Sequence, residues 1–220
     1  MKKKLLGLAL SVFILSASQA QGIRLNAYGN YVFDDKIDSY YSTTNYFSGT
    51  IKGGFLWGGG LEFRLKEYYG LELMYLRLDT DVPVNYWLNG DKRTTLKAGI
   101  NYIMANGVRS FPTHNPKFEP YGGLGFGMAI VDVENPDNNN NSNSATKFAW
   151  NVRFGANIWT SGRVGIKLQT MLISVPQGAG GGLYFGTGGV GAGVTTYSSI
   201  YQFILGGGLV FKLGHQAAAK

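Results

Sequence analysis

The sequence predicts an all-β chain, an eight-stranded antiparallel up-and-down transmembrane β-barrel, and three observations predict it. Glycine accounts for 33 of the 220 residues, and aromatic residues make up 14% of the chain. Apolar and polar residues alternate with period two in eight segments, which is the pattern of half-buried strands. Long and short connections alternate between these segments, as they do in membrane barrels.

The first four segments, in chain order, each carry their bulky apolar residues on one face. These faces are Ile23, Leu25, Ala27, Tyr31 and Phe33 in 23–33; Phe55, Trp57, Leu61, Phe63 and Leu65 in 55–66; Leu71, Leu73 and Tyr75 in 70–78; and Leu96, Ala98, Ile100, Tyr102 and Met104 in 94–104. The opposite faces carry charges, amides and glycines. We expect the bulky apolar face to meet lipid in each strand.

The last four segments repeat the pattern. Their apolar faces are Leu124, Phe126, Met128 and Ile130 in 120–133; Phe148, Trp150, Val152, Phe154, Ala156 and Ile158 in 147–159; Val164, Ile166, Leu168 and Leu172 in 163–173; and Tyr201, Phe203, Leu205, Leu209, Phe211 and Leu213 in 199–213. Each segment reaches the roughly nine to eleven residues of a tilted membrane strand. Eight is the smallest strand number of such barrels, and side chains just fill the bore.

The connections predict the topology. Four are long, two are short and one is of medium length: 34–54, 79–93, 134–146 and 174–198; 67–69 and 160–162; and 105–119. Membrane barrels have brief periplasmic turns and longer outer loops, so both termini are expected in the periplasm.

A soluble carrier of the lipocalin type would show the same alternation with its apolar face turned inward. Side-chain size favours the membrane barrel. The apolar face carries Trp57, Trp150 and Phe203, which crowd a narrow bore but which lipid accepts.

Charged residues on the glycine-rich face predict a closed, charge-filled lumen. We expect an ion-pair network, because an unpaired charge in a dry interior costs several kcal/mol. Its members are Arg24, Glu62, Arg64, Glu72, Arg153 and Lys167. The alternative is that these residues only hydrate the interior. Arg77 is the one charge that falls on the lipid face, where a headgroup position or a local bulge would accommodate it.

The first twenty residues have the pattern of a secretory signal peptide. Three lysines precede the apolar run Leu5–Leu15, and small residues up to Ala20 follow. We therefore expect residues 1–20 to be removed, residues 21–213 to form the barrel, and residues 214–220 to be a short periplasmic tail. Loss of the three lysines lowers the formal charge from +7 to +4, which argues against nucleic-acid binding.

Motifs for catalysis, cofactors or metals are weak. The chain has no cysteine, and its two histidines, His114 and His215, fall in the medium connection and the tail. Gly186, Gly188 and Gly191 match G-x-G-x-x-G, but β-prone residues follow where a nucleotide site needs a helix. We expect no enzyme activity, no cofactor and no metal.

Two motifs resemble the eight-stranded outer-membrane β-barrel family of Gram-negative bacteria, which includes OmpA-type and OmpW-type barrels. They are Pro120–Gly127 and the last strand, where Gly208, Phe211 and Leu213 are spaced like the signal read by the barrel-assembly machinery. The resemblance implies location in the outer membrane among lipid and lipopolysaccharide. The chain departs from the family by continuing past this signal with Gly214–Lys220. We expect no cell-wall tether of the kind that a peptidoglycan-binding domain provides after some of these barrels.

Aromatic residues cluster in two expected outer loops. Tyr40, Tyr41, Tyr46 and Phe47 lie in the first, and Tyr86 and Trp87 in the second. Such residues form either part of the interfacial girdle or a recognition surface for glycan, protein or lipopolysaccharide.

These observations predict a monomeric, non-enzymatic outer-membrane protein with a structural or surface-interaction role. Two alternatives stay open. One is OmpW-like passage of small hydrophobic molecules, with the 174–198 loop shaping a lateral exit. The other is an accessory subunit of a larger outer-membrane assembly.

Overall fold

The computed structural model describes residues 22–42, 45–87, 91–135, 141–176, 183–186, 193–196 and 199–213. The expected signal peptide, residues 1–20, and the expected tail, residues 214–220 with His215, lie outside these ranges. The described residues form the strands β1 (Gly22–Val32), β2 (Asp35–Ser42), β3 (Asn45–Ile51), β4 (Gly54–Lys66), β5 (Tyr69–Trp87), β6 (Asp91–Ser110), β7 (Phe118–Asn135), β8 (Asn141–Trp159), β9 (Val164–Val175), β10 (Leu183–Gly186), β11 (Gly193–Thr196) and β12 (Ile200–Leu213). Within them, no helix is long and apolar enough to cross a membrane.

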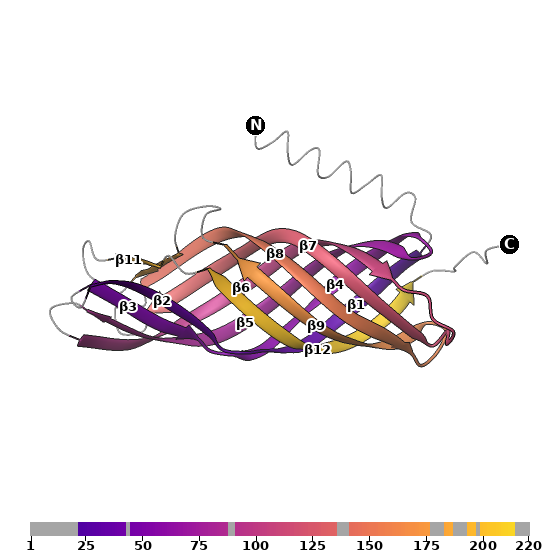
Figure 1. Ribbon diagram of the computed structural model, residues 1–220, viewed down its shortest axis with the longest axis horizontal. Coiled ribbons are helices and arrows are strands. Elements are labelled where there is room, and N and C mark those ends of the chain that lie inside the picture. Colours follow the sequence, from indigo (N-terminus) through magenta and orange to yellow (C-terminus); the bar gives the residue numbers. More distant parts are fainter. Residues whose placement is uncertain are drawn as a thin grey trace, which may run out of the picture.

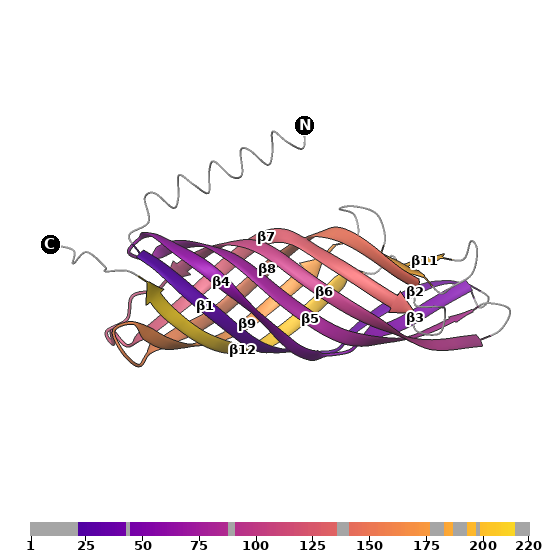
Figure 2. The ribbon, with the colours of Figure 1, turned by 180° about the vertical axis from the view of Figure 1, so that it is seen from behind.

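Eight of the strands pair into a closed antiparallel cylinder. Figures 1 and 2 show that its strands are tilted relative to the long axis. The barrel strands are β1, β4, β5, β6, β7, β8, β9 and β12. Each of these pairs with the next one in this order, and β12 pairs with β1, which closes the ring. The predicted fold class is therefore confirmed.

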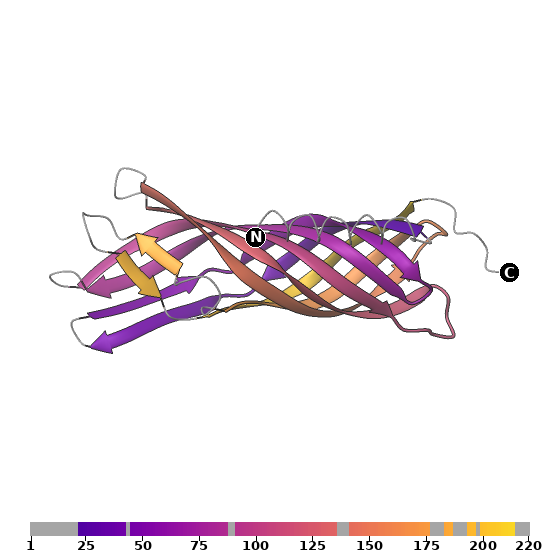
Figure 3. The same ribbon diagram turned by 90° about the horizontal axis from the view of Figure 1, so that it is seen from above.

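The two ends of the cylinder differ. At the terminus end, where β1 begins and β12 ends, the connections are 67–68, 111–117 and 160–163, and His114 lies in the second of them. The opposite end is named here the hairpin end, because β2 pairs with β3 and β10 pairs with β11 there. Figure 3 shows both small hairpins at this end. The glycine-rich 174–198 segment thus contains a folded-back hairpin, and β10 lies beside β8 while β11 lies beside β2.

Carboxylates fasten the β2–β3 hairpin to the barrel. Asp34 accepts hydrogen bonds from the Gly53 N–H at 2.7 Å and from Lys52 Nζ at 2.9 Å. The Gly53 bond and then the Lys52 bond lower the pKa of Asp34. Asp35 accepts from the Tyr201 N–H at 2.9 Å, which ties β2 to β12.

Two barrel hairpins are far longer than a membrane requires. Strands β5, β6, β7 and β8 contain 19, 20, 18 and 19 residues, against 11 in β1 and 12 in β9. A tilted strand crosses a bilayer in about 9–11 residues. The expected long loops 79–93 and 134–146 are thus mostly strand, and the β5–β8 wall continues well past the apolar band at the hairpin end.

The predicted facing is correct for seven of the eight barrel strands. Trp57 and Phe203 are 48% and 50% exposed on the outer surface, and Trp150 is half-buried on the same side. The prediction is wrong for 94–104, because Leu96, Ala98, Ile100, Tyr102 and Met104 point into the bore and are buried. The hairpin-end half of β6 lies past the apolar band. Its outer face therefore carries Thr95, Lys97 and Asn101, and its apolar residues turn inward.

Apolar side chains fill the hairpin-end half of the bore. They include Leu56, Leu76, Leu78, Leu96, Ile100, Ile173 and Ile204, each 0–1% exposed. The expectation of a wholly charge-filled lumen is therefore wrong for this half. On β6, where the outer face is polar, the hydrophobic effect gathers the apolar face inside. On β4 and β12 apolar side chains face both the bore and the outer surface.

Two leucines on β5 allow the stability contributions of the inner and outer faces to be compared. Leu76 is 0% exposed inside the bore and Leu73 is 40% exposed on the outer face. We expect Leu76→Ala to lower the free energy of unfolding by about 2–5 kcal/mol, because it leaves a cavity. Leu73→Ala should cost less, because lipid refills the space. Urea unfolding in lipid vesicles measures both, and an equal loss for the two variants would contradict this account of the core.

Candidate functional site

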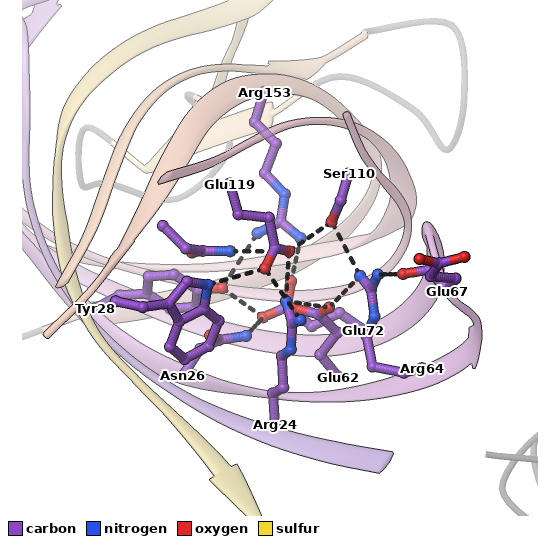
Figure 4. Close-up of polar contacts among 12 residues, drawn as sticks. Arg24, Asn26, Tyr28, Glu62, Arg64, Glu67, Glu72, Ser110, Glu119 and Arg153 are labelled. Atoms are coloured by element: carbon purple, nitrogen blue, oxygen red, sulfur yellow. Dashed lines mark hydrogen bonds and ion pairs between the residues drawn. The ribbon is translucent and has the colours of Figure 1, made fainter. Parts of the chain in front are cut away.

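The candidate site is a cluster of charged side chains that fills the terminus-end half of the bore (Figure 4). It is built from β1, β4, β5, β7, β8 and β9, with Ser110 at the end of β6. The period-two alternation turns every second residue of each strand inward, so residues distant in sequence meet across the narrow cylinder.

The outer layer of the cluster is centred on Glu119. Arg24 Nη1 and Nη2 donate to the two carboxylate oxygens of Glu119 at 2.7 and 3.2 Å. Ser110 Oγ and Trp159 Nε1 donate to the same carboxylate at 2.6 and 3.0 Å. The Lys212 ammonium lies 3.8 Å from the centroid of the Trp159 ring. Glu119 thus joins three strands at the mouth of the barrel.

Glu62 connects this layer to the next. Its carboxylate lies 3.6 Å from Arg24 Nη1 and 3.1 Å from Arg64 Nη1. Arg64 also donates to Ser110 Oγ at 3.1 Å and to the Glu67 carbonyl. Both Glu62 and Arg64 are buried, so the two arginines neutralise a carboxylate that water does not reach.

The inner layer is a fully buried ion pair between Arg153 on β8 and Glu72 on β5. Asn26 Nδ2 donates to Glu72 at 2.7 Å, and the Tyr28 hydroxyl donates to the same oxygen. Arg153 Nη1 lies 3.2 Å from the Tyr28 oxygen. A side chain at Gly60 would collide with the Glu72 carboxylate, which accounts for a glycine facing the bore there.

Lys167 meets the cluster through an aromatic ring. Its ammonium lies 4.3 Å from the centroid of the Tyr121 ring. The Tyr121 hydroxyl donates to Gln169 at 3.0 Å, and Gln169 Nε2 donates to Asn30 at 3.1 Å. Amide and hydroxyl side chains therefore continue the polar filling toward the apolar half.

All six residues of the expected network lie buried in the bore, and five of them form ion pairs within it. Sequence analysis missed Glu119 and Ser110, because it began one strand at Pro120 and ended another at Met104. Extending the alternation outward would have found Glu119, which lies on the same face as Tyr121 and Gly123. It would not have found Ser110, which lies on the same face as Tyr102 and Met104 and would have been assigned to lipid with them.

The cluster contains four cations and three carboxylates: Arg24, Arg64, Arg153 and Lys167, with Glu62, Glu72 and Glu119. Removing one partner from a buried pair leaves an uncompensated charge, which costs far more than an exposed pair contributes. Among the described residues, no group of three or more histidines or carboxylates could hold a metal ion. The arrangement suits a rigid plug rather than acid–base chemistry.

The backbone brings the expected loop aromatics onto neighbouring strands. Tyr40 pairs with Tyr46 between β2 and β3, and Phe47 pairs with Tyr86 between β3 and β5. Tyr41 and Trp87 lie on β2 and β5 as well. The side chains of all six lie outside the described part of the structure.

Arg77 lies on the outer face, as expected, without a bulge at its position. It pairs with Asp79 Oδ1 at 2.5 Å and donates to Asn101 Oδ1 at 2.9 Å, so its charge is neutralised locally.

Comparison with known proteins identifies similar barrels. Residues 5–195 match the family model described as the outer membrane protein beta-barrel domain. The solved structure of Neisserial surface protein A (NspA) matches with a TM-score of 0.54 and 13% identity, over 87% of this chain and 97% of that one. OprG from Pseudomonas aeruginosa matches with a TM-score of 0.53 and 12% identity, over 90% and 98%. AlkL, solved in lipid bilayers, matches with a TM-score of 0.53 and 11% identity, over 91% and 94%. None of the curated proteins compared matches the chain.

The buried pair predicts strong coupling between two distant strands. We expect Glu72→Ala to lower the free energy of unfolding by about 3–5 kcal/mol, because Arg153 is left charged without a partner. The double variant Glu72→Met, Arg153→Met should lose less than the sum of the two single substitutions. Lys52→Ala, which breaks an exposed pair, is the control and should cost about 1 kcal/mol or less. Strict additivity of the Glu72 and Arg153 substitutions in urea unfolding would contradict the coupling.

Proposed function

Because the chain belongs to the outer membrane protein β-barrel domain family, we propose that it is a non-enzymatic outer-membrane protein with a sealed bore and a structural or surface-interaction role. The observation that carries the proposal is the filling of the bore along its length. Ion pairs occupy one half, and closely packed apolar side chains occupy the other. An eight-stranded barrel filled in this way leaves no aqueous path.

The connections and strand lengths support an orientation for the proposal. Family barrels have short periplasmic turns and longer extracellular elements. The terminus end carries the short turns and the hairpin end carries β2–β3, β10–β11 and the long β5–β8 wall. In this orientation both termini lie in the periplasm, and the wall extends outside the cell.

The extracellular elements provide the surface for interaction. The six aromatic residues Tyr40, Tyr41, Tyr46, Phe47, Tyr86 and Trp87 fall on paired or neighbouring strands of this region. Clustered aromatics at the tip of a rigid barrel suit recognition of a glycan or a protein. A membrane complex in which this barrel is an accessory subunit would use the same kind of surface.

Passage of small hydrophobic molecules is a second candidate function. One observation favours it: the hairpin-end half of the bore is lined mainly by apolar side chains, among them Leu56, Leu78, Ile100 and Ile204. These residues are packed, so passage requires that they move apart. Uptake of an apolar solute by liposomes that contain the wild-type barrel would support this second candidate over a sealed barrel.

The sealed bore predicts the absence of channel activity. We expect the wild-type barrel in planar bilayers to show no discrete conductance steps. The variant Glu62→Ala, Glu72→Ala should also stay closed, because the apolar half seals the bore in series with the ion pairs. Adding Leu56→Ala and Leu78→Ala should produce conductance, since these two residues pair across neighbouring strands inside the apolar half. Steps of defined size from the wild type would contradict the proposal.

The six loop aromatics predict a loss of partner binding when they are replaced. Replacing all six loop aromatics by serine should reduce capture of surface partners by intact cells, because the apolar contact area is removed. The control is serine at Phe118 and Phe111, exposed aromatics near the terminus end. Unchanged capture by the six-residue variant would assign these residues to the interfacial girdle instead.

A further inference from the structure

Arg109 lies exposed on the outer wall of β6 at the terminus end of the barrel, beside two aromatic rings. Its guanidinium carbon lies 5.5 Å from the centroid of the Tyr69 ring and 5.6 Å from the centroid of the Phe111 ring. Contacts of this kind hold a guanidinium in place while its N–H groups stay available to an anion. Within the described part of the chain, Arg109 forms no ion pair and no side-chain hydrogen bond. The wall therefore presents a positioned cation without a counter-charge.

Two other exposed cations differ from Arg109 because the chain itself neutralises them. Arg77 pairs with Asp79 at 2.5 Å, and Lys52 pairs with Asp34 at 2.9 Å. Their guanidinium and ammonium groups already have a carboxylate partner. Arg109 has aromatic rings in the place of that partner, so an anion from outside the chain can bind it.

Arg109 lies where the apolar band of the outer wall ends. Toward the hairpin end the neighbouring strands carry Leu73, Leu124 and Phe126, each at least 40% exposed. Toward the terminus end the strands pass into the exposed connections 67–68 and 111–117. Cations and aromatic rings at such a boundary lie at the level of lipid headgroups. In the proposed orientation these headgroups belong to the periplasmic leaflet.

The wall beside Arg109 leaves space for an acyl chain. Gly107 is the next outward residue of β6, and it pairs with Leu71 on β5 and with Leu124 on β7. A β-carbon at Gly107 would have no atom closer than the Leu124 carbonyl oxygen, at 3.9 Å. The following outward residue, Ala105, is also small and exposed. A hydrocarbon chain that runs from Arg109 toward the membrane centre can therefore lie on the backbone of β6 with a leucine on each side.

The charges around Arg109 favour a lipid with a net negative charge. Lys66 on β4 pairs with Tyr69, so a cation stands on each side of this tyrosine. The adjacent carboxylate, Glu67, accepts a hydrogen bond from the Tyr68 hydroxyl at 2.9 Å. Arginine binds a phosphate group through two parallel N–H bonds. The ammonium group of a zwitterionic lipid such as phosphatidylethanolamine is repelled by the two cations, whereas an anionic headgroup is not.

We propose that Arg109 and the wall beside it bind one anionic phospholipid of the periplasmic leaflet. The phosphate accepts hydrogen bonds from the Arg109 guanidinium, the rings of Tyr69 and Phe111 contact the glycerol backbone, and one acyl chain lies over Gly107. The proposal rests on the proposed placement in the outer membrane and adds a lipid-selective site to it.

Two arginines at the terminus end provide a matched test. Arg109→Gln removes the cation between the rings, and Arg163→Gln removes the same charge from the exposed connection 160–163. The full barrel is inserted into nanodiscs that contain phosphatidylglycerol and phosphatidylethanolamine with identical acyl chains. Native mass spectrometry then counts the lipids that stay bound after release from the nanodisc. We expect the wild type and Arg163→Gln to retain one phosphatidylglycerol about tenfold more strongly than phosphatidylethanolamine, and Arg109→Gln to lose this preference.

Gly107→Leu tests the acyl-chain contact separately. The leucine fills the open position on β6 and keeps every charge of the site. We expect this variant to retain less phosphatidylglycerol than the wild type does. Heat-modifiable gel migration verifies that each variant is folded.

Competition distinguishes a lipid site from a site for free phosphate. Inorganic phosphate and glycerol 3-phosphate, which lack acyl chains, should not displace the bound lipid. Displacement by either compound, equal retention of the two lipids by the wild type, the same result for both arginine variants, or unchanged retention by Gly107→Leu would overturn the proposal. A wild type that does not insert into nanodiscs would instead contradict the membrane placement, so the two failures are distinguishable.

Discussion

The narrow bore of an eight-stranded barrel is the constraint on which the rest of this structure depends. Every second residue of every strand points into a space that only side chains can fill. At the terminus end the bore holds arginine, glutamate and amides, and toward the hairpin end it holds mainly leucine, valine and isoleucine. The polarity of the bore thus reverses along the axis while the facing of the strands stays constant.

This reversal explains which parts of the structure could be predicted from sequence. Alternation alone located all eight barrel strands, because period two survives whichever face is apolar. It assigned the facing correctly for seven strands, where bulky residues such as Trp57 and Phe203 meet lipid. It failed for 94–104, because alternation does not state whether the apolar face meets lipid or a core. Only the neighbours across the sheet, Asp79 and Asp132 beside Gly99, show that this part of β6 lies beyond the lipid band.

The charge cluster was predictable to a similar extent. Its six expected members lie on the polar face of strands whose opposite face is apolar, so the pattern predicted that their side chains point inward. Their pairing did not, because the partners lie across the bore and depend on strand stagger. Glu119 was not predicted, because it lies at the start of β7, next to the preceding connection. Strand boundaries are the least reliable part of an assignment from alternation.

The ion pairs across the bore also bear on how the cylinder is completed. Arg153 and Glu72 are separated by 81 positions in the chain, and Arg24 and Glu119 by 95. An open sheet cannot bring these partners together, since they lie on different sides of the finished cylinder. Arg24 has a second partner, Glu62, on the adjacent strand, whereas Arg153 and Glu72 meet only across the closed cylinder. Closure is therefore the event that expels water from the interior, and an intermediate with most strands in place would be poorly stabilised compared with the sealed form.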